Sequence, residues 1–272
     1  MPEANGLFYQ EFGESSGTPL ILSAGLGGSG AYWAPNIDHL AKGYRGANRV
    51  IVYDHRGTGR SDRALPDTVT VEDMGRDMLA LMDALEIAKA VIIGHAAGGV
   101  AGLALALIAP ERVERLIVVN GWAKADPHFL NVFRLRKAIL DGAGPEAYVR
   151  AQPLFLYPPY WFYGKDQVAL DADAAGHLAH FPAVETMHKR IDALAASDVA
   201  DRLHEITCPV LLIAAYDDLL VPWQCTRRLH DGLPNATYAF MRAGAHACNV
   251  TDPERFEEIV LLWLADEPIT EE

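Results

Sequence analysis

The sequence Val91-Ile92-Ile93-Gly94-His95-Ala96-Ala97-Gly98-Gly99 decides the fold that we expect for this chain. An apolar strand runs into the glycine spacing of a nucleophile elbow, the sharp strand-to-helix turn that presents a catalytic serine. Such a turn strains its central residue, so small residues are needed on both sides, and Gly94 and Gly98 provide them. The central residue is Ala96, which has no hydroxyl to attack a carbonyl. The segment therefore predicts the frame of a hydrolase without its nucleophile.

The composition is that of a folded protein with one large core. The chain has 272 residues, of which 50% are hydrophobic, enough for a core domain that carries an insertion. Its formal net charge is −13 without a basic block, so nucleic acid and anionic membranes are electrostatically disfavoured as partners. No apolar run approaches the ~20 residues of a bilayer span, and the first residues lack the features of a signal peptide. We therefore expect a cytoplasmic protein that acts on a small molecule.

Cysteine and histidine spacing gives little support for a metal site. The cysteines are odd in number and lack C-x-x-C spacing, so we expect reduced thiols and no structural zinc. They are Cys208, Cys225 and Cys248. His177, His180 and His188 fall within one segment, but no carboxylate or cysteine spacing completes a ligand set. We predict no metal and no cofactor.

Short apolar runs alternate with helical patterns along most of the chain, as a parallel sheet with crossover helices requires. Several runs are apolar throughout, which is typical of central parallel strands. The expected strands are 7–12, 20–24, 49–53, 90–93, 116–120, 210–214 and 237–241. The expected helices are 33–42, 71–85, 97–108, 224–233 and 253–264. The pattern predicts an α/β fold.

Residues 122–199 interrupt this alternation, because they are helix-like, aromatic and punctuated by prolines. We interpret them as an inserted helical cap, with the core formed by residues 1–121 and 200–272. The run 152–162 carries too many apolar rings to lie in water as a loop. These rings either form the packing core of the cap or line a pocket.

A glycine-rich turn follows the second expected strand. Its sequence is Ser23-Ala24-Gly25-Leu26-Gly27-Gly28-Ser29, and such a turn can aim a backbone N–H into a site. Leu26 and Ala97 are the natural pair of oxyanion donors. A phosphate-binding loop is less favoured, because the pattern G-x-x-x-x-G-K-[ST] is absent. The residues that we expect to line the substrate pocket are Gly25, Tyr32, Trp33 and Trp122, the last of which could instead be a hinge packing residue.

An acid and a histidine follow the elbow in the order of a catalytic triad. Asp217 and Asp218 come directly after the strand 210–214, and His246 follows the last expected strand. A loop histidine at that place can face the elbow across the carboxyl ends of the strands. Either carboxylate could be the acid, and the other would cap the loop.

The order of these segments resembles the α/β-hydrolase superfamily over nearly the whole chain. The chain is more closely similar to the RutD family, whose strings are matched at 25–30, 120–122, 151–158, 179–181, 217–222 and 246–254. The resemblance implies a mostly parallel eight-stranded sheet flanked by helices, with the helical cap inserted. The superfamily pattern G-x-x-D-x-x-V-P places the acid on Asp218. RutD-like proteins also carry alanine at the elbow, so Ala96 is consistent with a natural residue.

The resemblance further implies a hydrolase of pyrimidine (uracil) degradation that acts on a small C–N compound. The substrate would be carbamate, giving ammonia and CO₂, or aminoacrylate. Asp218 would orient His246, which would position or deprotonate a water, or relay a proton to the departing nitrogen. The N–H groups of Leu26 and Ala97 would hold the carboxylate or the developing oxyanion. RutD-like proteins also imply a homodimer, for which the aromatic cap offers a surface.

Two alternatives stay open at this point. The first is a serine ester or C–C hydrolase in which alanine replaces the serine at position 96, and it predicts that restoring serine gives strong acyl transfer. The second is a non-catalytic ligand-binding homologue, which predicts binding that is insensitive to the protonation of His246.

Overall fold

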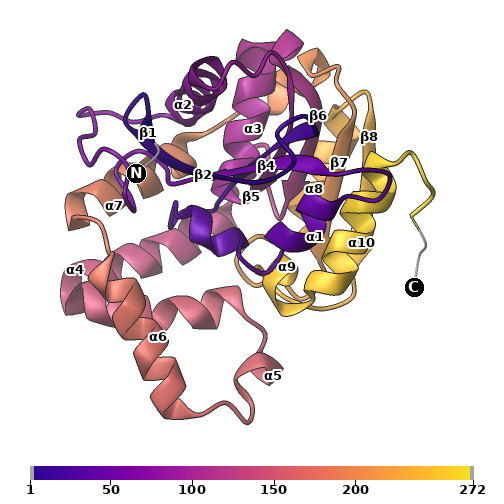
Figure 1. The fold of residues 1–272 in the computed structure, drawn as a ribbon. Helices are drawn as coiled ribbons and strands as arrows, with labels where there is room; N and C mark the ends of the chain where they lie inside the picture. The colour runs from indigo at the N-terminus through magenta and orange to yellow at the C-terminus, as the bar shows by residue number, and fades with distance from the viewer. Residues whose placement is uncertain (1–2, 270–272) are drawn as a thin grey trace.

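The computed structural model describes residues 3–269, and one mixed sheet runs through the centre of this part of the chain (Figure 1). Among the described residues, eight strands follow the order β1-β2-β4-β3-β5-β6-β7-β8. The pairs β1–β2 and β2–β4 are antiparallel, and every other neighbouring pair is parallel. The strands are β1 (Glu3–Ala4), β2 (Leu7–Gly13), β3 (Thr18–Ser23), β4 (Asn48–Tyr53), β5 (Ala90–His95), β6 (Val113–Val119), β7 (Val210–Ala215) and β8 (Ala236–Met241). The predicted fold class is confirmed.

Helices cover both faces of the sheet and bury two apolar cores. The side chains of a strand alternate between the two faces, so Ile92 of β5 belongs to one core while Val91 and Ile93 belong to the other. The helices are α1 (Ile37–Lys42), α2 (Val71–Ala84), α3 (Ala97–Ile108), α4 (Pro127–Leu156), α5 (Pro159–Phe162), α6 (Gln167–Ala179), α7 (Val184–Ala196), α8 (Trp223–Gly232), α9 (Cys248–Thr251) and α10 (Pro253–Leu264). Short 3-10 helices are η1 (Gly30–Trp33), η2 (Pro110–Arg112) and η3 (Ala200–Glu205). None of the helices in the described range is long and apolar enough to cross a membrane.

The predicted helix 33–42 is wrong at its beginning. The structure forms the 3-10 helix η1 up to Trp33, then turns, and α1 begins at Ile37. Pro35 explains the difference, because it has no N–H to donate to a helical ladder at this point.

The helices α4 to α7 form the segment between β6 and β7 that the sequence marks as a cap (Figure 1). Gly144 interrupts α4 with φ 82° and ψ 179°, so α4 consists of two arms, the second of which begins at Pro145. Proline suits the first turn of a helix because the N–H that it lacks would have no helical partner there. The two ends of the segment meet at the core, where the amide of Val199 donates to the carbonyl of Ala123 at 2.9 Å.

Candidate active site

The turn between β5 and α3 has the geometry of a nucleophile elbow. Ala96 lies at its apex with φ 48° and ψ −110°, a region that costs a non-glycine residue about 1–3 kcal/mol. Glycine is required on both sides of it. A Cβ at Gly94 would lie 2.4 Å from the backbone of Gly98, and one at Gly98 would lie 2.2 Å from the carbonyl oxygen of Ser23. The chain therefore keeps a strained elbow around a residue with no nucleophilic atom.

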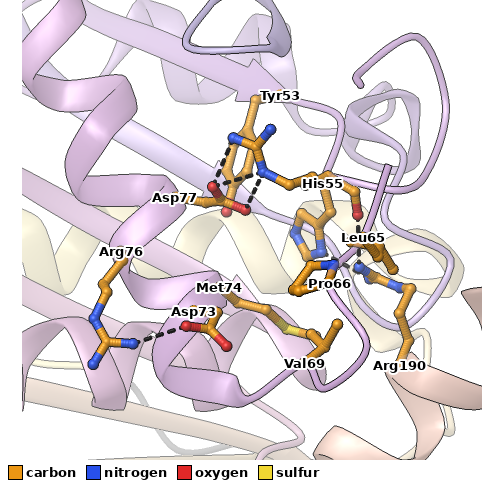
Figure 2. A pocket seen from close by; sticks show the side chains of 11 residues that line it. Tyr53, His55, Leu65, Pro66, Val69, Asp73, Met74, Arg76, Asp77 and Arg190 are labelled. Atoms are coloured by element: carbon orange, nitrogen blue, oxygen red, sulfur yellow. Dashed lines mark hydrogen bonds and ion pairs between the residues drawn. The ribbon is translucent and has the colours of Figure 1, made fainter. Parts of the chain in front are cut away.

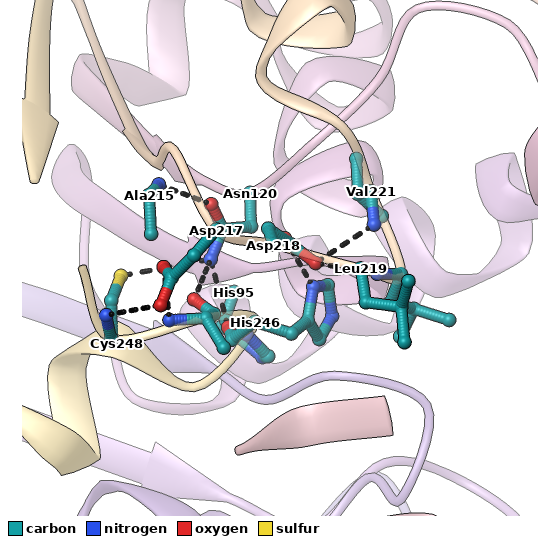
Figure 3. Close-up of polar contacts among 12 residues, drawn as sticks. His95, Asn120, Ala215, Asp217, Asp218, Leu219, Val221, His246 and Cys248 are labelled. Atoms are coloured by element: carbon teal, nitrogen blue, oxygen red, sulfur yellow. Dashed lines mark hydrogen bonds and ion pairs between the residues drawn. The ribbon is translucent and has the colours of Figure 1, made fainter. Parts of the chain in front are cut away.

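Asp218 and His246 form a buried hydrogen-bonded pair, shown in Figure 3. The Nδ1 atom of His246 lies 2.8 Å from Oδ2 of Asp218. The other carboxylate oxygen, Oδ1, accepts the amides of Leu220 and Val221 at 2.7 and 2.9 Å. Since an ionised carboxylate only accepts, Nδ1 of His246 carries the hydrogen in this pair. Nε2 is then left for acid–base chemistry, with no hydrogen bond to another residue between 3 and 269.

The turn that carries His246 is held from two sides. Asp217 accepts the amides of Gly244 and Ala245 at 3.3 and 2.8 Å, and Ala245 has a left-handed φ of 55°. Asn120, at the end of β6, donates from Nδ2 to the carbonyl oxygen of His246 at 2.8 Å (Figure 3). Thus Asp217 caps the loop, and its neighbour Asp218 is the carboxylate that meets the histidine ring.

His95, which the sequence reasoning did not single out, is a second histidine at this place. Its Nε2 lies 2.7 Å from the carbonyl oxygen of His246, so Nε2 is the donor and Nδ1 is bare. The ring stacks on Tyr32 with centroids 4.7 Å apart, and the Tyr32 hydroxyl donates to Asn249 at 2.8 Å. Burial, with a smaller contribution from His246, holds the pKa of His95 well below its usual value. His95 is therefore a neutral residue that supports the backbone of His246. Its position directly before Ala96 in the elbow is the sequence feature from which this role could have been predicted.

The glycine-rich turn lies directly against the elbow. A Cβ at Gly25 would lie 2.9 Å from Nδ1 of His95 and 3.7 Å from Cβ of Ala96. The amide of Leu26 follows in this turn, and the amide of Ala97 is at the first position of α3. No acceptor for either N–H is found within residues 3–269. Free N–H groups at a helix N-terminus favour a negatively charged oxygen.

Two aromatic residues that we expected in the pocket have other surroundings. The structure does not bring Trp33 to the Asp218–His246 pair, because its ring is buried in the core and packs on Phe256. Trp122 packs on Phe129 at a centroid distance of 4.5 Å, and its Nε1 donates to Ser197 at 3.3 Å. Trp122 thus lies where the cap leaves and rejoins the core, which is the hinge position.

Arg190 of α7 connects the cap to the glycine-rich turn. Its guanidinium is buried, and Nε and Nη2 donate to the carbonyl of Leu26 at 3.1 and 3.0 Å. Nη2 also lies 2.9 Å from Nδ1 of His55, whose Nε2 lies 3.0 Å from the Ser23 hydroxyl. A cavity of about 220 Å³ lies beside these groups (Figure 2), and Tyr53 also lines it. Neither Asp218 nor His246 lines this cavity.

The three cap histidines do not assemble into a ligand set. His188 pairs with Asp141 at 2.7 Å, and no group of three or more His, Cys, Asp or Glu suited to a metal occurs in the part of the chain that the structure describes.

These features define a class of protein. A family model for the alpha/beta hydrolase fold matches residues 18–253, and the chain belongs to the α/β-hydrolase family. A hydrolase from Pseudomonas aeruginosa PA01 superposes with a TM-score of 0.83 at 28% identity, over 95% of this chain and 94% of that one. The enol-lactonase from Burkholderia xenovorans LB400 gives a TM-score of 0.83 at 28% identity, over 96% and 98%.

Curated relatives narrow the class further. The chain is 48% identical to a Caulobacter sp. (strain K31) protein named "Putative carbamate hydrolase RutD", over 97% of both chains. It is 46% identical to an Azorhizobium caulinodans protein of the same name, over 96% of this chain and 97% of the relative. The chain is a member of the RutD family, and this membership supports a hydrolase role in the Rut pathway.

Proposed function

We propose that the protein hydrolyses a small C–N compound of pyrimidine degradation, carbamate, to ammonia and CO₂ without a serine nucleophile. The observation that carries the proposal is the buried Asp218–His246 hydrogen bond of 2.8 Å, in a chain whose elbow residue is Ala96. The acid–base pair of a hydrolase is retained, while the group that would form a covalent intermediate is absent. The names of the curated relatives support carbamate as the substrate.

Carbamate breakdown needs a proton more than it needs a nucleophile. In the proposed step, protonated His246 gives the proton on Nε2 to the carbamate nitrogen, and the C–N bond breaks. Its electron pair leaves with ammonia, and the remaining carboxylate becomes CO₂, so that H₂NCOO⁻ and H⁺ give NH₃ and CO₂. Solvent then returns a proton to His246. Asp218 stabilises the imidazolium, as the acid of a triad does.

The backbone donors hold the substrate for this step. The free N–H groups of Leu26 and Ala97 would bind a carboxylate oxygen, with the N-terminus of α3 behind them. A covalent intermediate mainly helps with difficult bonds such as those of stable amides and esters. Serine enzymes stripped of triad members keep about 10³–10⁴ of acceleration from oxyanion donors and binding. A substrate that decomposes readily suits such a catalyst.

The test is stopped-flow measurement of ammonia and CO₂ release from freshly mixed carbamate. We expect acceleration by the wild-type protein and a loss of about 10²–10⁴-fold in His246→Ala, the usual range for a general acid–base group. An Ala96→Ser variant is the matched comparison. If the wild type equals the uncatalysed rate while Ala96→Ser cleaves aryl esters rapidly, the protein is a disabled serine hydrolase. If none of the three is active, a binding role replaces the proposal.

A further inference from the structure

A guanidinium without a counter-charge is buried inside the cap. Arg136 on the first arm of α4 is only 3% exposed, and its Cζ lies 4.9, 5.1 and 5.7 Å from the ring centroids of Phe133, Tyr148 and Phe155. None of the ion pairs among residues 3–269 includes it. The faces of aromatic rings attract a cation, but they do not satisfy N–H donors. A buried charge normally has a partner of opposite sign, so this one is unusual in a chain of net charge −13.

Two hydrogen-bond donors are unused at this place. Nη2 of Arg136 donates to the Tyr148 hydroxyl at 2.7 Å, whereas Nε is buried without any partner. The Tyr148 hydroxyl accepts this bond and makes no other within the described range, so its own hydrogen is free. Nε and Nη2 are bonded to the same guanidinium carbon, so the free N–H of Arg136 and the free O–H of Tyr148 belong to one small cluster of donors.

Arg56 shows which group binds to the Nε and Nη2 atoms of a guanidinium when both of them donate. Its Nε and Nη2 donate at 3.0 and 2.9 Å to the carboxylate of Asp77, the bidentate arrangement that suits a planar carboxylate. On Arg136, Nη2 holds only a tyrosine hydroxyl, which adds a further donor, and Nε holds nothing. No carboxylate of the described chain binds either atom.

The place lies between the two arms of α4, close to the His246 turn. Arg136 comes from the first arm, and Tyr148 and Phe155 come from the second. The residue after Phe155 is Leu156, whose carbonyl accepts the amide of Ala247 at 2.9 Å. Ala247 follows His246 directly in sequence. The helix that carries Phe155 thus contacts the loop of the candidate active site through its next residue.

We propose that Arg136 and Tyr148 bind the carboxylate of a small planar anion, one oxygen receiving the Nε–H and the other the tyrosine O–H. The inference rests on the proposed function, because carbamate belongs to this class of ligand. The aromatic walls favour a flat molecule, and the single positive charge favours a monoanion. In a chain this acidic, the site gives an anionic substrate a place to bind in the cap next to the catalytic loop.

The binding test uses bicarbonate, which has the shape and charge of carbamate and is stable. Affinity is measured from the broadening of the ¹³C signal of labelled bicarbonate on titration with the full-length protein. We expect Arg136→Met to weaken binding at least tenfold and Tyr148→Phe to weaken it several-fold. Arg134→Met is the matched control, because Arg134 is exposed on the same helix, and it should leave the affinity unchanged. Unchanged affinity in Arg136→Met overturns the inference.

A stability measurement separates binding from a structural role. Replacing a buried, unpaired charge by an apolar side chain is often neutral or stabilising, so Arg136→Met should melt at or above the wild-type temperature while binding less bicarbonate. Loss of both stability and binding in this variant, with full binding in Tyr148→Phe, would assign Arg136 to the packing of the cap. If Arg136→Met does not fold, Arg136→Lys tests the same point, since a lysine cannot present the guanidinium edge.

The outcomes also separate this inference from the proposed function. If the wild type accelerates carbamate breakdown but its bicarbonate affinity survives Arg136→Met, only the inference fails. If bicarbonate binds through Arg136 but carbamate breakdown is not accelerated, only the proposed function fails. If both hold, Arg136 and Tyr148 bind carbamate first, before it reaches the N–H groups of Leu26 and Ala97, and Arg136→Met should lower kcat/KM for carbamate while leaving kcat at saturating carbamate nearly unchanged.

Discussion

Replacing Ala96 by glycine should be close to neutral for stability, although it removes a buried methyl group. Ala96 is 5% exposed and has φ 48° and ψ −110°. Glycine adopts this conformation freely, so the substitution releases about 1–3 kcal/mol of strain. It also costs about 0.5–1 kcal/mol through the greater freedom of glycine in the unfolded chain, and about 0.8 kcal/mol for the lost methyl. The net change should lie between a loss of about 0.8 and a gain of about 1.7 kcal/mol.

The control is Ala101→Gly in α3, which removes an equally buried methyl at an unstrained helical position. It should lose about 2 kcal/mol, from helix propensity and the methyl together. Urea unfolding followed by circular dichroism gives both free energies, provided that the dependence on urea concentration is unchanged. If Ala96→Gly loses as much as Ala101→Gly, the elbow is not strained and the reasoning is refuted. Carbamate breakdown should continue in Ala96→Gly, because the proposed step uses no atom of this side chain.

Three further predictions concern the acid, the buried histidines and the thiols. Asp218→Asn should lower the rate of carbamate breakdown at least about tenfold, because an amide stabilises the His246 imidazolium less than a carboxylate does; an unchanged rate in stopped flow would remove Asp218 from the mechanism. Burial lowers the pKa of His55 and of His95 well below 6.5, so below that pH the unfolded chain binds protons that the folded chain does not. The free energy of unfolding should therefore decrease as the pH is lowered below about 6.5, by up to about 1.4 kcal/mol per pH unit for each histidine. When this free energy is measured by urea unfolding at several pH values, it should depend less steeply on pH in His55→Gln than in the wild type. Burial raises the pKa of Cys248 to about 12, so iodoacetamide at pH 8 should modify this thiol only after unfolding; rapid labelling of the native protein, detected by mass spectrometry, would contradict the described burial.

Local patterns predicted the sheet and the order of its elements, because each central strand is a short apolar run with its own boundary signals. They missed β1, a strand of two residues, which is too short to show an alternation. The same patterns predicted an interrupted, helical insertion. Gly144 divides α4, but nothing local determines which side chains meet across the two arms, as Arg136 and Tyr148 do at 2.7 Å.

The acid and the histidine of the candidate site were predictable, because their residue types and their order along the chain are those of a catalytic triad. Features of the site that depend on how side chains pack were less predictable. Asp217 and Asp218 are neighbours with identical side chains, and only the path of the loop turns one toward His246 and the other toward the amides of the turn. Trp33 follows the glycine-rich turn and was predicted to line the pocket, but the 3-10 helix that carries it directs its ring into the core. Contacts of this kind join residues far apart in sequence, so no local periodicity encodes them.

The contact between Arg190 and the carbonyl of Leu26 affects how the cap and the core unfold. Separating the cap from the core would leave a guanidinium in an apolar interface, or require water to enter and solvate it, and the carbonyls of Leu26 and Arg56 would lose their donor. Opening at this end of the cap therefore breaks buried hydrogen bonds of the core. The two segments should melt in a single calorimetric transition, and a shortened chain without residues 122–199 should not persist as an independent folding unit. In an engineered hybrid, a cap taken from another hydrolase would need its own buried cation at this position.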